Sequence, residues 1–237
     1  MDWFGSDYYL KLYKNRNHKE AEQFLDTLLN YLDAPKSSRV IDVCCGRGRH
    51  SIYLSKMGYQ VLGIDAAEKS IEYAQKYEQP NLRFKVKNIL SEFADNEFDL
   101  ALNVFTSFGY FNNDSDSFES LNNIGKGLKP NGQLIIDYLN QNHVVKNLKP
   151  ADNILIDGVE YDIKRWADNR FIRKEIKVVD GQAQYIFNEQ VRRFDFNDFS
   201  KMLLKAGFKV KATFGDYGLH KFEYEQSSRL IIHAVKQ

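Results

Sequence analysis

A glycine turn between two acidic residues constrains this chain more than any other part of its sequence. Residues 40–50 read V-I-D-V-C-C-G-R-G-R-H, and the apolar residues 61–64 lead directly into Asp65. The implied order is strand, tight turn, helix, strand and acid. In a parallel sheet this order places the turn and the second carboxylate side by side at the carboxyl edge, where nucleoside ligands bind. The pattern therefore predicts a nucleoside site at that edge.

The residues within this motif narrow the choice of nucleoside. Gly46 and Gly48 lack the Cβ that would collide with a ligand approaching the backbone. Asp65 can accept hydrogen bonds from both hydroxyls of a ribose. Asp42, beside the turn, would repel a pyrophosphate but suits a cationic amino-acid group, so a dinucleotide fits this turn poorly. The alternative is that Asp42 is a structural carboxylate that accepts hydrogen bonds from the amides of the turn.

Apolar segments of two periodicities alternate over roughly the first 140 residues. Strands are expected at residues 39–43, 60–64, 82–86, 98–104 and 133–138, with a turn at 129–132. Helices are expected at residues 18–33, 51–57, 67–77 and 115–128. This alternation predicts an α/β fold in which a parallel sheet is covered by helices on both faces.

The pattern changes after about residue 140. Residues 154–159, 170–179 and 184–196 alternate with period two, and Asp180-Gly181 predicts a hairpin turn. A helix at 197–205, with Asn197 as its expected N-cap, and strands at 208–214 and 229–235 resume the first pattern. We therefore expect a Rossmann-like core of residues 1–140 and 197–237 around a seven-stranded, mostly parallel sheet. Residues 141–196 are expected to form an antiparallel β insertion that covers an acceptor or provides a dimer surface.

Charge and composition argue against several classes of function. With 33 basic and 32 acidic residues the net charge is +1, so the chain offers no strong field for a polyanion and no nucleic-acid partner is expected. Cys44 and Cys45 are adjacent, which disfavours a disulfide between them and suits a reducing cytosol. The sequence contains no metal-ligand spacing and no apolar run of transmembrane length. We expect a cytoplasmic protein with no metal and no membrane contact.

The turn D-x-C-x-G-x-G resembles the first motif of class I S-adenosylmethionine-dependent methyltransferases, which usually reads D-x-G-x-G-x-G. The segment L-K-P-N-G-Q-L at 128–134 is similar to that family's turn before strand five. Segments 206–208, 215–217 and 228–230 are similar to a bacterial small-molecule subgroup with an added antiparallel sheet. The architecture is similar to that of amino-sugar N-methyltransferases and glycine N-methyltransferase. The resemblance implies S-adenosylmethionine as cofactor and a small-molecule acceptor, an amine or a hydroxyl.

The motif and the resemblance together predict a cofactor site. The resemblance implies that Asp42 faces the methionyl end, that Asp65 binds the ribose, and that Asn88 and Ile89 wall the adenine. Cys44 departs from the family's glycine and is expected to narrow the mouth of the site. The full predicted set is Tyr9, Tyr13, Asp42, Cys44, Gly46, Gly48, Arg49, Asp65, Ala66, Asn88, Ile89, Asn103 and Phe105.

Each of these assignments has a structural alternative. Tyr9 and Tyr13 are implied to close a lid over the cofactor, and the alternative is a helix with buried rings. Asn88 and Asn103 can instead tie down loop backbone, and Arg49, proposed to pair with a cofactor carboxylate, can be a solvated side chain. His50 reads more readily as a core or capping residue than as a base.

Aromatic residues follow the fourth expected strand. Phe108, Tyr110 and Phe111 are predicted to bind the acceptor, because ring faces stabilise a sulfonium or methylammonium cation. At least two of the four rings at 105–111 are also expected to belong to the core. His220 is the preferred general base, with Tyr217 beside it as a second catalytic candidate, and His143 is a weaker alternative.

Methyl transfer needs little from side chains beyond positioning, because the positive charge on sulfur already activates the leaving group. Absence of a catalytic dyad is therefore compatible with activity. The alternatives to a small-molecule enzyme are an RNA or protein methyltransferase, a protein that binds the cofactor without turnover, and, more distantly, a nicotinamide-dependent reductase. A homodimer is also compatible with the apolar residues of the insertion.

Overall fold

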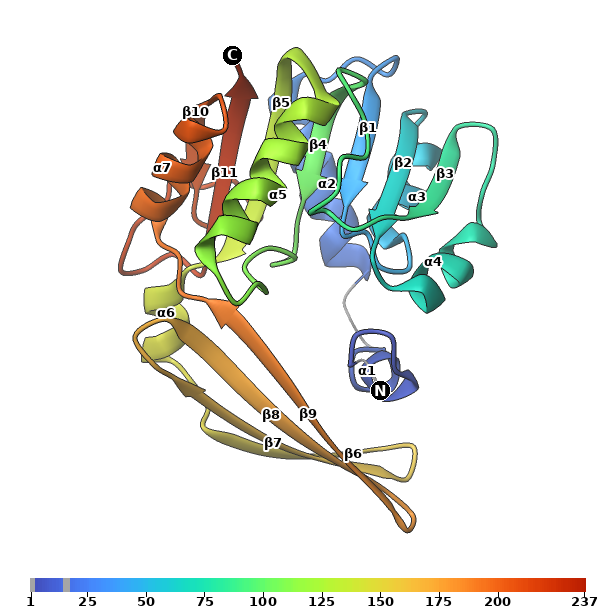
Figure 1. Ribbon diagram of the computed structural model, residues 1–237, viewed down its shortest axis with the longest axis vertical. Helices are drawn as coiled ribbons and strands as arrows, with labels where there is room; N and C mark the ends of the chain where they lie inside the picture. Colours follow the sequence, from blue (N-terminus) through green and yellow to red (C-terminus); the bar gives the residue numbers. More distant parts are fainter. Residues whose placement is uncertain (1–2, 15–17) are drawn as a thin grey trace.

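The computed structural model describes residues 3–14 and 18–237, which form two sheets (Figure 1). Sheet A has seven strands in the order β10-β11-β5-β4-β1-β2-β3, and sheet B has four in the order β6-β7-β8-β9. Neighbouring strands from β5 to β3 in sheet A are parallel, and β11 runs antiparallel to both β5 and β10. The predicted fold, a mostly parallel seven-stranded sheet with an added antiparallel one, is confirmed.

The strands of sheet A lie close to their predicted positions. They are β1 (Arg39–Val43), β2 (Gln60–Asp65), β3 (Leu82–Val86), β4 (Phe98–Asn103), β5 (Leu128–Leu139), β10 (Phe208–Phe214) and β11 (Arg229–Lys236). The turn predicted at 129–132 is instead part of β5, where Phe98 pairs with Leu128 but Leu100 pairs with Gln133. Asn131, with φ of 62°, absorbs the extra residues as a bulge within the strand.

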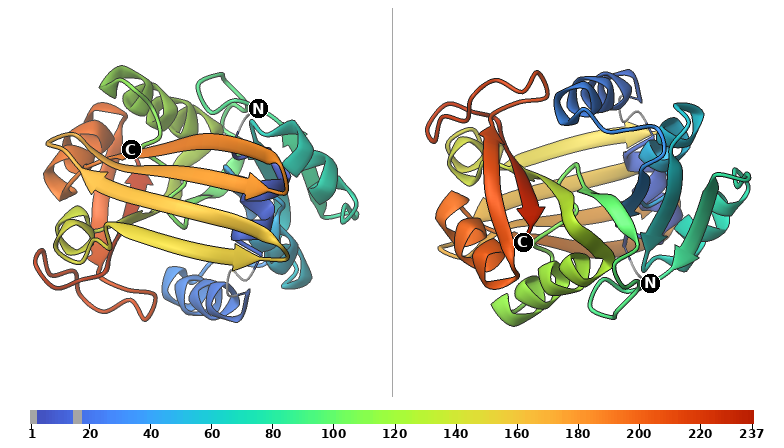
Figure 2. Two further views of the ribbon diagram at one scale, coloured as in Figure 1. Left: turned by 90° about the horizontal axis from the view of Figure 1, so that it is seen from below. Right: turned by 90° about the horizontal axis from the view of Figure 1, so that it is seen from above.

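Helices cover both faces of sheet A, as Figure 2 shows from its two ends. One face carries α2 (His18–Leu32), α3 (Arg49–Lys56) and α4 (Glu68–Gln75), and the other carries α5 (Asp114–Gly127) and α7 (Phe196–Lys205). Successive residues of a strand point to opposite faces, so Val40 packs with α2 and α3 while Ile41 packs with α5 and α7. Within the described ranges no helix has both the length and the apolar character needed to cross a membrane.

The start of α7 differs from the prediction. Its N-cap is Asp195 rather than Asn197. The Asp195 carboxylate accepts the Asp198 N–H at 2.9 Å, and the Asp198 carboxylate accepts the Asp195 N–H at 3.0 Å. In this reciprocal capping box each carboxylate accepts the backbone N–H of the other residue. The helix therefore begins two residues earlier than it would with a cap at Asn197.

Sheet B lies across the carboxyl edge of sheet A (Figures 1 and 2). It follows α6 (Gln141–Lys146) and consists of β6 (Ala151–Ile156), β7 (Val159–Ala167), β8 (Phe171–Asp180) and β9 (Ala183–Arg192). The turn at Asp180-Gly181 occurs as predicted. A second hairpin turn at Asp157 and Gly158, with φ of 50° and 79°, divides what the sequence suggested was a single strand, and β7 was not predicted.

The amino-terminal helix α1 (Asp7–Leu12) packs on sheet B rather than on the helices of the core. Trp3, just before it, is 4% exposed and its ring lies 4.8 Å from that of Phe187 in β9. Tyr161 and Ile176 complete an apolar cluster between α1 and sheet B that is separate from the two clusters flanking sheet A. Sheet B therefore holds α1 opposite the carboxyl ends of β1 to β4.

Close packing against one ring fixes the glycine turn. Gly48 has φ of 79°, and a Cβ built on it would overlap the ring of Phe84 in β3. Gly63 in β2 approaches the same ring, with a built Cβ 2.6 Å from Phe84 Cδ1. Gly46 also has positive φ, 55°, but faces open space. The two glycines of the turn thus share a backbone constraint, and only Gly48 has a packing constraint as well.

We predict that Gly48→Ala destabilises the protein by about 2–4 kcal/mol, combining backbone strain with overpacking. Gly46→Ala carries the strain alone and should cost about 1 kcal/mol. Urea unfolding without ligand measures both free energies, and adding Phe84→Leu to Gly48→Ala should recover the packing part. Equal costs for the two single variants would contradict the role given to Phe84.

His233 in β11 ties α2 to sheet A. Its side chain is 8% exposed, and the Tyr31 hydroxyl lies 3.0 Å from Nδ1. Burial lowers the pKa of His233 to about 4 from its ordinary value of 6.5, because the cation loses its hydration. The unfolded chain therefore binds a proton that the folded chain does not as pH falls from 6.5 towards 4, and stability is lost over that interval.

Between pH 7.5 and pH 5 this residue should remove about 2 kcal/mol of unfolding free energy from the wild type. His233→Phe should lose that part of the pH dependence. Tyr31→Phe, which removes the hydrogen bond but keeps the imidazole, should retain it. The measurement is urea unfolding at the two pH values. An unchanged pH dependence in His233→Phe would rule out the buried neutral imidazole as its source.

Candidate active site

A cavity of about 890 Å³ opens at the carboxyl edge of sheet A, beneath α1. Its wall is formed by the turn after β1, the end of β2, one face of α4, the loops after β3 and β4, and α1. Most of the residues predicted to bind cofactor or acceptor lie in this wall: Tyr9, Tyr13, Cys44, Gly46, Arg49, Asp65, Ala66, Asn88, Ile89, Phe105, Phe108, Tyr110 and Phe111.

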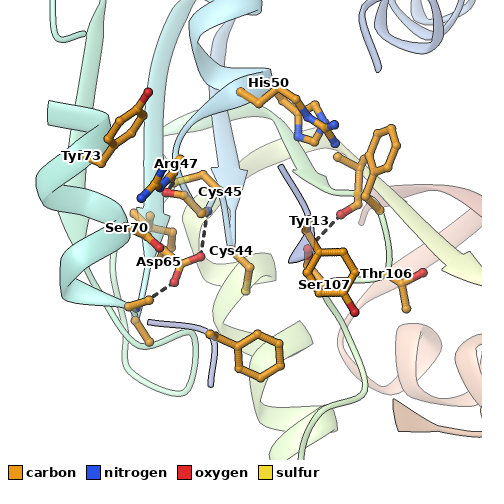
Figure 3. Close-up of a pocket in the computed structure, with 18 of the residues that line it drawn as sticks. Tyr13, Cys44, Cys45, Arg47, His50, Asp65, Ser70, Tyr73, Thr106 and Ser107 are labelled. Carbon is orange, nitrogen blue, oxygen red and sulfur yellow. Dashed lines mark hydrogen bonds between the residues drawn. The ribbon is translucent and has the colours of Figure 1, made fainter. Parts of the chain in front are cut away.

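Asp65, in the wall of the cavity, joins the turn after β1 to the turn after β2 (Figure 3). Its Oδ2 accepts the Gly46 N–H at 2.8 Å, and its Oδ1 accepts the Ala67 N–H at 2.8 Å. The carboxylate is thereby fixed in orientation at the end of β2. A carboxylate oxygen can accept more than one hydrogen bond, so hydroxyl groups of a ligand are chemically suited to this carboxylate.

Cys44 occupies the position at which the glycine turn begins. It has φ of 61°, a left-handed conformation that residues with a side chain seldom adopt, and it is half-buried in the cavity wall. Burial raises the pKa of its thiol, and the carboxylates of Asp65 and Asp42 add to that rise. Cys44 is therefore a neutral, uncharged part of the wall.

Three predicted residues lie behind the cavity rather than in its wall, as far as the described residues define it. Asp42 is 1% exposed and accepts a hydrogen bond from Ser51 Oγ at 2.5 Å. Burial raises the pKa of Asp42 to about 6, although the Ser51 hydrogen bond opposes the rise. Asn103 is fully buried and donates from Nδ2 to the Val43 carbonyl at 3.1 Å. Gly48 caps α3 against Phe84.

The loop after β3 combines the two roles considered for Asn88. Its side chain lies in the cavity wall, and its Oδ1 accepts the Leu90 N–H at 2.9 Å. Ile89 is 9% exposed, and its carbonyl accepts the Asn123 amide of α5 at 3.1 Å. The loop is thus anchored from beneath while its upper surface faces the cavity.

The turn after β4 brings an aromatic ring and two basic side chains together. Phe105 and Thr106 have φ of 60° and 57°, and the Phe105 ring stacks on His50 with centroids 4.8 Å apart at 18°. The Arg49 guanidinium carbon lies 4.7 Å from the same ring centroid. All four residues line the cavity. Arg49 is therefore held over a ring rather than extended into solvent.

Aromatic residues further along this loop are divided between cavity and core. Phe108 lines the cavity but is 2% exposed and packs against the rings of Phe194 and Phe199. The ring of Tyr110 meets that of Phe4 edge to face, with centroids 5.3 Å apart. This contact connects the loop after β4 to the segment preceding α1 and closes one side of the cavity.

The two predicted lid tyrosines lie next to each other, Tyr9 in α1 and Tyr13 at its C-cap, with ring centroids 4.8 Å apart. The Tyr13 hydroxyl accepts a hydrogen bond from Lys174 of β8 and donates to Glu189 Oε1 of β9 at 3.4 Å. Trp3 Nε1 donates to the same carboxylate. Sheet B thus determines where Tyr13 stands, although none of its described residues lines the cavity.

The two catalytic candidates lie on the loop after β10, and among the described residues neither is part of the cavity wall. The His220 side chain is 82% exposed, and its Nδ1 lies 2.9 Å from the Asp216 carboxylate. Tyr217 packs on Phe105, with centroids 5.0 Å apart, and donates to Asp137 Oδ2 at 3.3 Å. Burial raises the pKa of Tyr217, so its hydroxyl stays protonated. Their catalytic role remains a prediction.

One face of α4 belongs to the cavity and was missed from the sequence. Ser70, Tyr73 and Tyr77 line it, and the Arg47 guanidinium carbon lies 4.2 Å from the Tyr73 ring centroid. The spacing of these residues by three and four is a detectable signal, because it marks the helix face next to the inward residues Ile71 and Ala74. In residues 3–14 and 18–237 no three potential metal ligands come together.

Comparison with known proteins agrees with this geometry. Residues 35–197 match the family model described as a methyltransferase domain. A putative methyltransferase of Bacillus subtilis, YqeM, is 26% identical over 215 residues, covering 85% of each chain. Glycine N-methyltransferase of Mus musculus is 27% identical over 61% of this chain and 55% of its own length.

Solved structures share the fold over nearly the whole chain. An S-adenosylmethionine-dependent methyltransferase from Clostridium acetobutylicum superposes with a TM-score of 0.81 at 18% identity, covering 97% of this chain and 96% of that one. The resemblance predicted from the glycine turn is confirmed by the family match, and with it the enzyme class and its methyl donor, S-adenosylmethionine. The chain belongs to the methyltransferase-domain family of S-adenosylmethionine-dependent enzymes.

Proposed function

We propose that the cavity beneath α1 binds S-adenosylmethionine beside a small-molecule acceptor and transfers the methyl group to an amine or hydroxyl of that acceptor. The observation that carries the proposal is the Asp65 carboxylate, fixed by the N–H groups of Gly46 and Ala67 in the cavity wall. A rigid acceptor pair at the end of β2 suits the two hydroxyls of a ribose. Arg49, held over Phe105, then faces the carboxylate of the amino-acid end.

The remaining wall supports the same orientation. Asn88 and Ile89 flank the adenine side, and the turn containing Gly46 lets backbone approach the ligand. Cys44, neutral and half-buried, narrows the space without adding charge. Asp42 lies behind the turn, where it accepts a hydrogen bond from Ser51 of α3. It acts on the amino-acid end of the cofactor through Ser51 and α3 rather than by direct contact.

Size and lining support a small acceptor. A volume of about 890 Å³ lies within the range of pockets that enclose one or two small molecules. Phe4, Tyr9 and Tyr110 close its upper side, which restricts entry of a polymer. Among structures of similar fold, a SAM-bound amino pentose methyltransferase from Micromonospora echinaspora superposes with a TM-score of 0.70 at 17% identity. We extend its acceptor class, a small molecule, to this chain.

Catalysis by positioning fits these residues. When bound, the cofactor supplies a methyl group on a positively charged sulfur, ready for in-line displacement by a nucleophile. The chain's part is to align the acceptor, exclude water and stabilise cationic character through aromatic faces such as Phe105 and Tyr110. Sheet B contributes by holding α1, and so Tyr9 and Tyr13, over the cavity. In this way the 141–196 insertion serves as an acceptor cover without contacting the acceptor.

S-adenosylhomocysteine should stabilise the protein by about 2.7 kcal/mol at a concentration one hundred times its dissociation constant. Asp65→Ala should weaken binding by about tenfold or more, because charged hydrogen bonds to the ribose are lost. Calorimetric titration measures the affinity, and thermal unfolding measures the stabilisation.

Asp99→Ala is the matched control. Like Asp65, Asp99 accepts a backbone N–H, from Arg39 at 2.8 Å, and it pairs with Lys129 at 2.7 Å. It lies near the amino-terminal end of β4, at the edge of sheet A away from the cavity. Its removal should leave the affinity unchanged. Wild-type protein that ignores the ligand, or Asp65→Ala with wild-type affinity, would refute the proposed site.

If positioning carries catalysis, His220→Asn should retain kcat/KM within about threefold, since a general base typically contributes a factor of about 10² to 10⁴. Asparagine keeps a hydrogen-bonding group near Asp216. The assay uses isotopically labelled methyl donor and an acceptor found by screening amines and hydroxyl compounds. A loss of about a hundredfold or more would instead establish His220 as the base.

A further inference from the structure

A buried ion pair behind the cavity has no place in the site described so far. Asp137, near the end of β5, is 0% exposed, and Arg229 at the start of β11 donates from Nε to its Oδ1 at 2.8 Å. Neither residue is part of the cavity wall among the residues described. Removing a charge completely from water costs free energy unless neighbouring groups pair with it and hydrogen-bond to it. The contacts of the Asp137 carboxylate therefore indicate its role.

Both backbone amides of the turn after β4 are directed at this one residue. The Phe105 N–H donates to Asp137 Oδ2 at 2.7 Å, and the Thr106 N–H donates to the Asp137 carbonyl at 2.9 Å. Arg229 continues the network by donating from Nη2 to Thr106 Oγ1 at 2.8 Å. The Tyr217 hydroxyl is a further donor to Oδ2, at 3.3 Å.

The conformation of that turn requires such support. Phe105 and Thr106 are consecutive residues with positive φ, 60° and 57°, and both carry side chains that disfavour this region. Residues in this conformation persist only where neighbouring groups over-determine it. Asp137 supplies a hydrogen-bond acceptor to each of the two amides, so it is the residue that specifies the turn.

The turn after β4 also determines the position of the Phe105 ring, over which the Arg49 guanidinium lies. The guanidinium carbon lies 4.7 Å from the ring centroid, and His50 and Tyr217 hold the ring from its other sides at 4.8 Å and 5.0 Å. A change in the turn would therefore move the support of Arg49, which the proposed function places at the amino-acid end of the site. The adenosine end, around Asp65 and Asn88, has its own hydrogen bonds and does not depend on this turn.

We propose that Asp137, paired with Arg229, is a positioning residue for the amino-acid end of the cofactor, acting through the turn at Phe105 and Thr106 and the Phe105 ring on Arg49. This inference rests on the proposed function. It separates two halves of the site: Asp65 determines how the adenosine is held, and Asp137 determines how the methionyl carboxylate is held. Asp137 itself lies outside the described wall of the cavity.

Two ligands that differ only in the amino-acid group test this division. S-adenosylhomocysteine carries it, and 5′-methylthioadenosine lacks it. Asp137→Asn keeps the shape of the side chain but removes its charge, and should weaken S-adenosylhomocysteine binding by about tenfold while changing 5′-methylthioadenosine binding by less than about twofold. Asp99→Asn removes a different ion-paired carboxylate of sheet A and should change neither affinity. Calorimetric titration of both ligands against the wild type and each of the two folded variants gives the six constants needed.

Thr106→Val is the second variant, for the case in which Asp137→Asn does not fold. It removes only the hydrogen bond from Arg229 to Thr106 and should give the same selectivity on a smaller scale, about threefold for S-adenosylhomocysteine. An equal loss for both ligands would overturn the proposal, because it indicates a general structural role. No loss for either ligand would also overturn it. Wild-type protein that binds neither ligand would instead refute the proposed function on which the inference depends.

Discussion

The hydrogen bonds from Gly46 and Ala67 to the Asp65 carboxylate are the constraint on which the rest of the site depends. They join the turn that leaves β1 to the turn that leaves β2, so two segments separated along the chain move as one. These hydrogen bonds fix the orientation of the Asp65 carboxylate. They also give the Gly46 N–H an acceptor, because the left-handed backbone of the turn directs this N–H away from α3. Cys44, with φ of 61°, lies between two fixed residues, because Val43 pairs with Ile64 of β2 and the Cys45 N–H donates to the Ile64 carbonyl at 2.9 Å.

Sheet B organises the site indirectly. In the described part of the chain none of its residues lines the cavity, but it positions α1, which does. A helix as short as α1 is not stable by itself. It is ordered because Trp3 is buried against Phe187 and because Tyr13 is engaged by Lys174 and Glu189. The strands of sheet B appear in the sequence as an insertion. They affect the cavity by positioning α1, which comes from the amino-terminal part of the chain.

The sequence predicted what depends on local pattern. The alternation of apolar strands and amphipathic helices gave sheet A, and the glycine turn with Asp65 gave part of the cavity wall. It could not place groups whose role depends on packing between distant segments. Asp42 carries the motif yet is bonded to Ser51 behind the wall. Local signals were also misread, since the turn at Asp157 and Gly158 was a detectable hairpin signature. The capping box of Asp195 lay two residues before the expected cap.

Two buried carboxylates, Asp42 in β1 and Asp137 in β5, lie in the strands on either side of β4 and are stabilised in different ways. Among the side chains of residues 3–14 and 18–237, the Ser51 hydroxyl is the donor to Asp42, and burial raises the pKa of Asp42 to about 6. Its charge is thus only weakly held when the site holds no cation, and a positively charged ligand nearby would lower that pKa and favour the ionised form. Asp137 is opposed by the full charge of Arg229 and by the Phe105 amide, which counteract the effect of burial. The Asp42 carboxylate therefore accepts a hydrogen bond from an uncharged hydroxyl, whereas the Asp137 carboxylate faces a full positive charge and supports the backbone turn after β4.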